Sequence, residues 1–481
     1  MEAATGEIIA YIDDDAYPDP DWLKFLAASF SRTDHAGIGG PNFAPPEEGL
    51  IANSVAHAPG GPVHVLLSDE IAEHIPGCNM AYRLSQLRAI GGFDTRFRVA
   101  GDDVDICWSL QERGLTLGFS AAAVVWHHRR TSIRCYWKQQ KAYAQAEALL
   151  AEKWPQKYNG AGHPSWRGHL YGAGVTKFFW GRSRIYHGSW GSALFQSIYE
   201  PAAEGLSVLP LMPEWYVVVI LLGCLATLGF SWPPLLLLLP VFAAAVTLSL
   251  VQAAGAATRA QFHPQPVLRR FAARMLVAQL HLLQPLARLL GRVRHGLGPW
   301  SRTGASLGPV PVMYEREIWS EKWQSGDARL TEIQSSLLRA GGVATKGGDF
   351  CPWDLSVSGG LFGSIRAIAM LEEHGGGKQL FRLRAWPKVP GLALWFLLVM
   401  SVIAALAGLD QAGFAAAFTG LMALRIVMLM WVDCAKAMTI WTKAIDEYVR
   451  LQGAGSGSES TNCNSSDPLS TIPCDSRAKL C

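Results

Sequence analysis

Three clusters of charged residues have types and spacing that could do chemistry. The first is Asp13, Asp14 and Asp15, which follow the apolar run IIAYI. Adjacent carboxylates repel one another, and hard oxygen ligands of this kind suit Mg²⁺ or Mn²⁺. A divalent cation held here would neutralise both the carboxylates and a bound diphosphate. A lone acidic run in a loop is more often a solvated turn, so the other two clusters decide the interpretation.

The second cluster is Asp102, Asp103 and Asp105, in the segment AGDDVDICWSLQERG. One positioned carboxylate can act as a general base that removes a proton from a hydroxyl group. Acidic residues are also favoured in the first turn of a helix by its dipole, and Gly114 is a suitable C-cap for such a helix. For Asp105 this structural explanation is the better one.

The third cluster is His127, His128, Arg129 and Arg130, directly after the run AAAVVW. A basic surface run of this type is usually a solvated turn. At the end of a strand that faces an acidic triplet, however, Arg129 and Arg130 are well suited to bind a diphosphate.

Residues 1–200 have the alternating pattern of an α/β domain that positions these clusters. IIAYI and AAAVVW predict short buried strands, and WLKFLAASF predicts a helix that begins near Trp22 and is capped by Asp19 or Asp21. With 50% hydrophobic and 17% charged residues, the whole chain is too apolar for a disordered or purely soluble protein.

The apolar residues are concentrated in two blocks. No charged residue lies between Glu214 and Arg259, so 206–256 predicts a transmembrane hairpin that turns at Trp232-Pro233-Pro234. A second hairpin is expected over 390–432, with its turn at Gly408-Leu409-Asp410. The segment between the hairpins is rich in arginine and the outer turns have no Lys or Arg, which places that segment and both termini in the cytosol.

The rest of the chain divides into three segments. Residues 257–310 predict interfacial amphipathic helices, with a packing helix of a soluble subdomain as the alternative. Residues 311–386 predict a small cytosolic α/β insert of unknown role, and 453–481 a disordered tail. The net charge of +3 gives no case for nucleic acid as a partner, and nine scattered cysteines without a CxxC motif indicate neither a zinc site nor a disulfide framework.

In order and spacing, the motifs resemble one family. The segments IDDDAYPDPDWL, GCNMAYR, GGFDTRF, GDDVDICWSL and FSAAAVVWHHRR together cover about residues 3–165. They resemble family 2 inverting glycosyltransferases with a GT-A (nucleotide-diphospho-sugar transferase) fold, of the membrane-anchored bacterial type that builds O-antigen or exopolysaccharide. The expected fold is therefore a GT-A-like α/β domain followed by an all-α transmembrane region that carries the small α/β insert.

The resemblance also implies roles for individual residues. Asp103 matches the catalytic base, and Asp102 stands where the family usually has Glu. Asp13 and Asp15 would bind the metal on the diphosphate, which is Mg²⁺ or Mn²⁺, although Asp13 could instead contact the ribose. A histidine would be the third ligand, and His127 is favoured over His128. The expected donor and acceptor pocket comprises Asp13, Gly77, Asn79, Gly91, Gly92, Phe93, Asp94, Asp102, Arg129 and Arg130.

Two features depart from the family pattern. The segment QQKAYAQAEALL stands where processive synthases have a QxxRW motif, which it lacks, so processive polymerisation is disfavoured. The family's sheet begins several strands before the acidic triplet, whereas twelve residues precede Asp13 here, so the chain is expected to be truncated at its N-terminus.

The sequence therefore predicts a multi-pass protein of the inner membrane with a cytosolic catalytic domain. It would transfer a sugar from a nucleotide-diphosphate donor to a lipid-linked or glycan acceptor, with inversion and with membrane lipids as partners. The alternative is an inactive transferase remnant that scaffolds glycan assembly. A transporter is a weaker hypothesis, because four spans without polar faces offer no path for a substrate.

Overall fold

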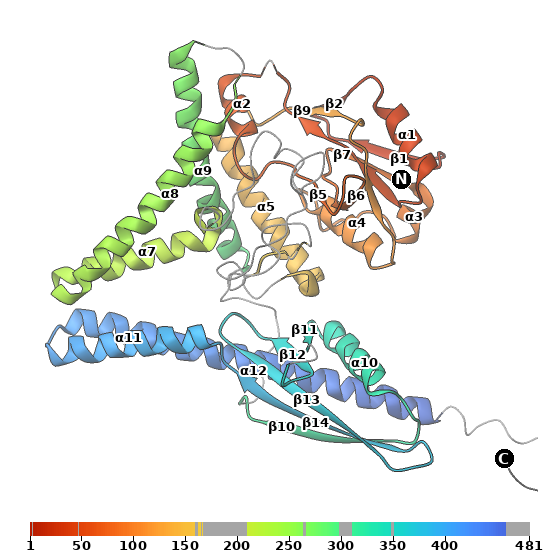
Figure 1. The fold of residues 1–481 in the computed structure, drawn as a ribbon, viewed down its shortest axis with the longest axis vertical. Coiled ribbons are helices and arrows are strands. Elements are labelled where there is room, and N and C mark those ends of the chain that lie inside the picture. The colour runs from red at the N-terminus through yellow and green to blue at the C-terminus, as the bar shows by residue number, and fades with distance from the viewer. Residues whose placement is uncertain are drawn as a thin grey trace, which may run out of the picture.

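The computed structural model describes residues 1, 3–46, 48–158, 162–164, 166, 209–262, 266–297, 310–347 and 351–457, with side chains of the last helix described to residue 452. Parts of the expected segments 1–200, 206–256, 257–310 and 311–386, and the tail from 458, lie outside these residues. Figure 1 shows an N-terminal α/β domain, two hairpins of long helices and a second sheet close to the C-terminal helix.

The N-terminal domain is built on a mixed six-stranded sheet in the order β1-β7-β3-β8-β6-β5. Among the described residues its one parallel pair is β3 with β8. The strands are β1 (Ile8–Ile12), β3 (Gly37–Gly39), β5 (Val65–Leu66), β6 (Ile71–His74), β7 (Asn79–Arg83) and β8 (Leu117–Phe119). A smaller sheet joins β2 (Ala16–Pro18), β9 (Val125–His127) and β4 (Asn42–Phe43).

Helices cover both faces of the six-stranded sheet. The helix α1 (Trp22–Arg32) buries Trp22, Leu26 and Phe30, which recur every four residues and so lie on one side of the helix. On the other face lie α3 (Leu84–Ala89) and α4 (Asp102–Gln111). Alternate residues of β7 enter the two cores, as the period of a strand requires. The domain also contains α2 (Leu50–Ala56), α5 (Ile133–Lys153) and a 3₁₀ turn, η1 (Pro155–Lys157).

Within the described ranges, four helices are long and apolar enough to cross a membrane. The first hairpin comprises α7 (Pro213–Thr227), extended by η5 (Leu228–Phe230), and η6 (Pro233–Leu238) with α8 (Leu239–Arg259). It turns at the expected Trp-Pro-Pro step. The second comprises α11 (Gly391–Leu409) and α12 (Gly413–Gly457), with its turn at Asp410 as expected. In Figure 1 the hairpins extend to one side, and the two sheet domains lie at their opposite end.

Helix α12 differs from the expectation, because it does not end near residue 432. It continues to Gly457, so the first five residues of the expected disordered tail are helical. Its second half is buried against the second domain, in which the sheet β10-β14-β13-β12-β11 is antiparallel throughout. The elements are β10 (Tyr314–Ser320), α10 (Gly326–Arg339), β11 (Val343–Lys346), β12 (Leu355–Ser358), β13 (Ser364–Glu373) and β14 (Gln379–Lys388).

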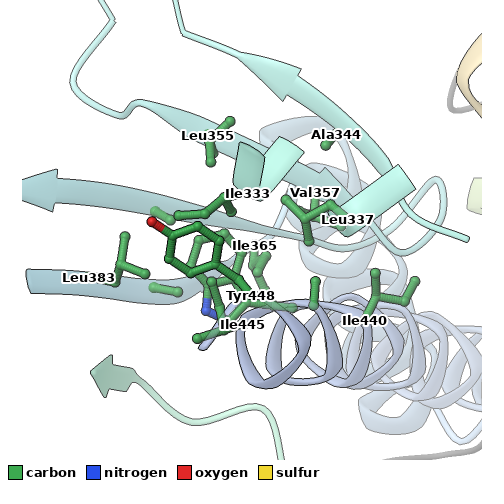
Figure 2. Packing of buried hydrophobic residues seen from close by; sticks show 14 of the residues in the cluster. Ile333, Leu337, Ala344, Leu355, Val357, Ile365, Leu383, Ile440, Ile445 and Tyr448 are labelled. Atoms are coloured by element: carbon green, nitrogen blue, oxygen red, sulfur yellow. The ribbon is translucent and has the colours of Figure 1, made fainter. Parts of the chain in front are cut away.

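The core of this second domain explains the length of α12. Ile440, Ile445 and Tyr448 of α12 pack beside Ile333 and Leu337 of α10 (Figure 2). These side chains fill the core of the sheet, so the helix is stabilised by burial beyond the apolar block.

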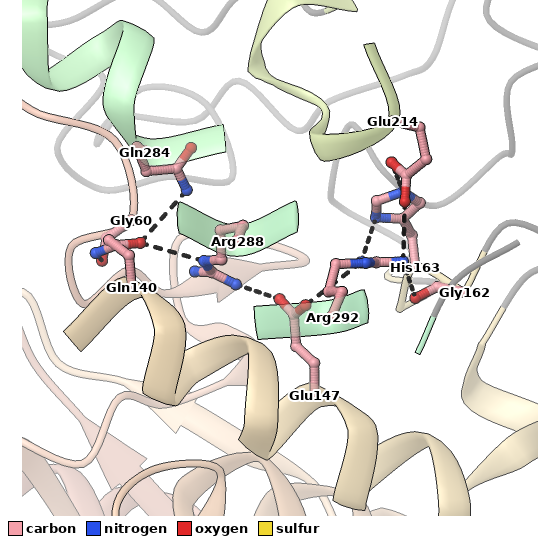
Figure 3. Close-up of polar contacts among 9 residues, drawn as sticks. All are labelled: Gly60, Gln140, Glu147, Gly162, His163, Glu214, Gln284, Arg288 and Arg292. Carbon is pink, nitrogen blue, oxygen red and sulfur yellow. Dashed lines mark hydrogen bonds and ion pairs between the residues drawn. The ribbon is translucent and has the colours of Figure 1, made fainter. Parts of the chain in front are cut away.

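A buried polar network attaches the first hairpin to the N-terminal domain. Helix α9 (Val267–Arg294) carries Arg288 and Arg292, which both pair with Glu147 of α5. Arg292 also lies 3.2 Å from a carboxylate oxygen of Glu214, at the start of α7 (Figure 3). In the described part of the segment 257–310, where several amphipathic helices were expected, α9 is one continuous helix of 28 residues. It packs closely against α5, because a Cβ at Gly291 would lie 2.6 Å from Ala144.

Candidate active site

The acidic triplet lies where β1 ends. The backbone N–H of Ala16 donates to the carbonyl of Asp13, which turns the chain into β2. Pairing of β2 with β9 places Ala16 opposite His127. As a result His127 Nε2 lies 3.0 Å from Asp15 Oδ1 and 3.8 Å from Asp13 Oδ2. One ligand atom from each of these three residues lies within 4.8 Å of the others, so the cluster could hold a metal ion.

The hydrogen bonds of His127 assign its protons. Arg129 Nη1 lies 2.9 Å from His127 Nδ1, and a guanidinium group can only donate, so Nδ1 accepts. Burial, with a further contribution from Arg129, lowers the pKa of His127 to about 4, so the ring is neutral near pH 7. Its one proton is on Nε2 and is donated to Asp15. Coordination of a metal by Nε2 would require this proton to move to Nδ1 and Arg129 to turn away.

The other residues of the HHRR segment point in different directions. His128 Nδ1 and the backbone N–H of Arg129 both contact the buried Glu48 carboxylate, at 3.1 and 2.9 Å. His128 is thus directed away from the aspartates, and His127 is the histidine beside them. Arg129 is buried behind His127 and donates to Asn42. Arg130 is more exposed and its Nη1 donates to Asp15 Oδ2 at 2.9 Å.

Asp103 lies at the start of α4 and accepts two backbone hydrogen bonds. The N–H of Gly77 donates to Oδ2 at 3.0 Å, and the N–H of Val104 donates to Oδ1 at 2.8 Å. The preceding Gly101 has φ +90°, and a Cβ there would lie 3.2–3.3 Å from Ala146, Leu150 and Phe97. Only glycine therefore fits at the residue that starts this helix.

The acids of α4 and of β1 form one electrostatic group. Burial, then the Asp103 charge, raises the pKa of Asp102 to about 6, and Asp13 contributes further. The pKa of Asp13 is raised by burial first and then by Asp15, Asp103 and Asp14. A site in which carboxylates disfavour one another's ionisation is suited to a cation, and clusters of shifted pKa values are common at functional sites.

Comparison with known proteins identifies the family. The family described as "Glycosyl transferase family group 2" matches residues 8–250, more than half of the chain. The chain belongs to this family. The transferase match therefore includes the acidic triplet, the Asp102–Asp103 pair, the HHRR segment and most of the first apolar hairpin, up to residue 250 in α8.

Two relatives of this family 2 chain are informative. The chain is 29% identical over 165 residues to the pre-mycofactocin glycosyltransferase of Mycobacterium tuberculosis, which is matched in two strains. The aligned region covers 33% of the chain and 34% of this relative. The chain is 26% identical over 164 residues to the O-antigen biosynthesis protein RfbC of Myxococcus xanthus, which covers 29% of the chain and 13% of that protein. The chain thus matches about a third or less of each relative's length.

Several residues expected in the pocket of this family 2 chain have structural roles. Asn79 is fully buried, donates to the carbonyls of Pro41 and Ala123, and accepts from Trp22 Nε1. These three hydrogen bonds join β7 to α1 and to the loops that follow β3 and β8, so Asn79 has a structural role in the core of the domain. Arg129 was expected to bind the diphosphate. It is buried and donates a hydrogen bond to Nδ1 of His127.

The GGFD segment forms a turn that is tied to α5. Gly91 and Gly92 have φ +88° and +76°, which explains both glycines. Phe93 packs edge-on against Tyr11 with ring centroids 5.1 Å apart. Asp94 accepts from Arg96 and from Lys153, and these hydrogen bonds hold its pKa well below the usual range. This turn is therefore held by its own contacts, and only Gly77 of the expected glycines touches Asp103.

Asp105 and His74 complete the description. Asp105 is buried and pairs with Lys153 and Trp154 Nε1, in agreement with a structural role.

His74, which no motif singled out, lies 3.5 Å from Asp103 Oδ2. The two residues are far apart in the sequence, so only the position of β6 beside α4 reveals the contact.

Proposed function

We propose that this chain is an inverting glycosyltransferase that moves a sugar from a nucleotide-diphosphate donor to a lipid-linked or glycan acceptor. The observation that supports it most is the convergence of Asp13, Asp15 and His127 with the Asp102–Asp103 pair, within a domain of glycosyltransferase family group 2. The name of the Myxococcus xanthus relative supports a role in polysaccharide assembly.

In this proposal Asp13 and Asp15 hold Mg²⁺ or Mn²⁺, with His127 as a third ligand after its proton has moved. The ion would neutralise charge on the departing diphosphate. Arg130, which already contacts Asp15, would add a positive charge at the same place. The carboxylate oxygens supply the hard ligands that these ions prefer.

Asp103 is proposed as the general base. It would accept the proton of an acceptor hydroxyl while the hydroxyl oxygen bonds to the anomeric carbon and the bond to the diphosphate breaks, with its electrons leaving on the diphosphate. The two N–H donors fix the orientation of the Asp103 carboxylate. Because the attack comes from the side opposite to the leaving group, the sugar configuration is inverted.

The proposed location is the inner membrane, crossed by both hairpins, with the catalytic domain in the cytosol. The arginines of α9 lie between the hairpins, and the N-terminal domain and the second sheet lie at the same end of the apolar helices (Figure 1). This arrangement would bring a lipid-linked acceptor close to Asp103. The exposed Val267, Leu268 and Phe271 at the start of α9 fit contact with membrane lipids.

The test is turnover of UDP-, dTDP- and GDP-sugars by the full chain in liposomes, measured as release of nucleoside diphosphate with Mn²⁺ or with EDTA. We expect Mn²⁺-dependent release from at least one donor, and its loss in Asp15→Asn. Asp14→Asn is the matched control, because Asp14 is adjacent in sequence but does not belong to the possible metal-binding group of Asp13, Asp15 and His127. Absence of turnover with every donor, with or without Mn²⁺, would favour a scaffold instead.

A further inference from the structure

The imidazole of His74 faces the carboxylate that we propose as the base. His74 is the last residue of β6 and is 8% exposed. Its Nε2 lies 3.5 Å from Asp103 Oδ2, and its Nδ1 lies 3.1 Å from the carbonyl oxygen of Val63. The ring of Trp166 packs against it with centroids 5.5 Å apart. Backbone, carboxylate and indole thus fix the orientation of this ring.

The hydrogen-bonding groups around His74 define what Nε2 can do. A carbonyl only accepts, so Nδ1 carries a proton and donates it to Val63. Nε2 is buried and makes no hydrogen bond to any residue in the described part of the chain. Only the doubly protonated ring presents an N–H to Asp103, whereas a bare Nε2 would direct a lone pair at the carboxylate. The separation of 3.5 Å is slightly too long for a hydrogen bond, and such catalytic contacts commonly tighten when substrate binds.

We propose that His74 is a positioning residue for Asp103. From its anchor on Val63, its Nε2–H closes onto Asp103 Oδ2 when substrates bind and leaves Oδ1 to receive the acceptor proton. The inference rests on the proposed function, because it gives His74 a role only if Asp103 is the base. His74 keeps its own protons throughout, and the proton balance of the transfer is unchanged.

The electrostatic environment of Asp103 agrees with this geometry. Burial alone would raise the pKa of Asp103, but the contact with His74 and the N–H groups of Val104 and Gly77 outweigh burial and hold the pKa below its ordinary value. His74 is the one side chain at ion-pair distance from Asp103 within the described residues. Titratable groups that interact electrostatically with Asp103 or His74 in the described part of the chain include Asp13, His64, Cys78, Tyr82, Asp102, Cys107 and Tyr143.

The neighbouring His64 does not substitute for His74. It is fully buried, and burial, with a smaller effect of His74, lowers its pKa to about 3. It is therefore neutral wherever the enzyme would work. Asp13 and Asp102 carry negative charge when ionised and would oppose ionisation of Asp103, so the contact with His74 acts against them.

Two substitutions separate positioning from mere packing. His74→Phe keeps a ring against Trp166 but has no donor, and His74→Gln keeps an N–H donor without charge. We would measure kcat/KM for nucleoside diphosphate release with Mn²⁺ as a function of pH. Activity falls at low pH as Asp103 gains a proton. Loss of the contact raises the pKa of Asp103, so this acid limb should move to higher pH in His74→Phe and by less in His74→Gln.

The control is His35→Phe, since His35 precedes β3 and contacts Thr116, away from Asp103. It should leave the acid limb and the donor affinity unchanged. The proposal would be overturned if both His74 variants lost the same fraction of activity at every pH and their acid limbs did not move. Full activity in both His74 variants would also overturn it. If His74→Phe does not fold, the His74→Gln profile decides. Retained turnover in Asp103→Asn would remove Asp103 as the base and with it the role of His74, whereas absence of turnover by the wild type would put the proposed function itself in error.

Discussion

Replacing Asp103 with Asn removes the proposed proton acceptor while nearly preserving the shape of the side chain. The carboxylate accepts from Gly77 at Oδ2 and from Val104 at Oδ1, whereas an amide has one accepting oxygen. One of these two N–H groups would lose its partner, which costs about 1 kcal/mol of folding stability. Loss of a general base lowers turnover by about 10²–10⁴-fold, equivalent to about 3–5 kcal/mol in the activation barrier.

The assay is nucleoside diphosphate release together with donor binding, both in Mn²⁺. We expect Asp103→Asn to bind donor as the wild type does and to turn it over at least about 10²-fold more slowly. Asp21→Asn, at an exposed position before α1, is the control for the loss of one negative charge. Wild-type turnover in Asp103→Asn would refute the assignment. A loss of donor binding equal to the loss of turnover would show that Asp103 binds substrate and is not the base.

Three further predictions concern stability. Because the pKa of Asp102 is raised to about 6 in the folded protein, its ionised form lowers the free energy of unfolding. This cost is complete above pH about 6 and disappears as the pH falls toward the ordinary carboxyl range. The free energy of unfolding of Asp102→Asn should therefore exceed that of the wild type by about 1–3 kcal/mol at pH 8, and the difference should vanish near pH 4. Gly101→Ala forces a side chain into φ +90° and should cost about 1–3 kcal/mol, while Gly49→Ala, with φ −66° and open space, should cost nothing measurable in thermal unfolding. Gly359→Ala would place a Cβ 1.8 Å from the carbonyl oxygen of Asp433, so proteolysis should cut the second sheet domain faster than in the wild type.

Local patterns were sufficient to predict the elements nearest the site. IIAYI forms β1, WLKFLAASF lies in α1 and the Asp102–Asp103 segment begins α4. Each has a strong short-range signal: a continuous apolar run, apolar residues every four positions, or acids that follow a glycine. The hairpin turns were predictable for the same reason, because Trp-Pro-Pro and Gly-Leu-Asp interrupt otherwise uncharged blocks.

Features that depend on tertiary contacts were not predictable. The composition after residue 432 is polar on one side only, and α12 continues because the second sheet domain buries Ile440 and Tyr448. Asn79 and Arg129 resemble ligand-binding residues by type, yet their hydrogen bonds hold strands and His127 in place. His74 has no motif at all, since its contact with Asp103 arises only from the packing of β6 beside α4.

The most direct test of the central claim is whether Mn²⁺ and a sugar nucleotide bind together at the acidic cluster. Calorimetric titration of the wild type with a UDP-, dTDP- or GDP-sugar, with and without Mn²⁺, would be compared with Asp13→Asn, Asp15→Asn and Asp14→Asn. The account predicts Mn²⁺-dependent binding that is lost in the first two variants and retained in Asp14→Asn, which lies outside the cluster. Donor binding that is indifferent to Mn²⁺, or equal in all three variants, would contradict it.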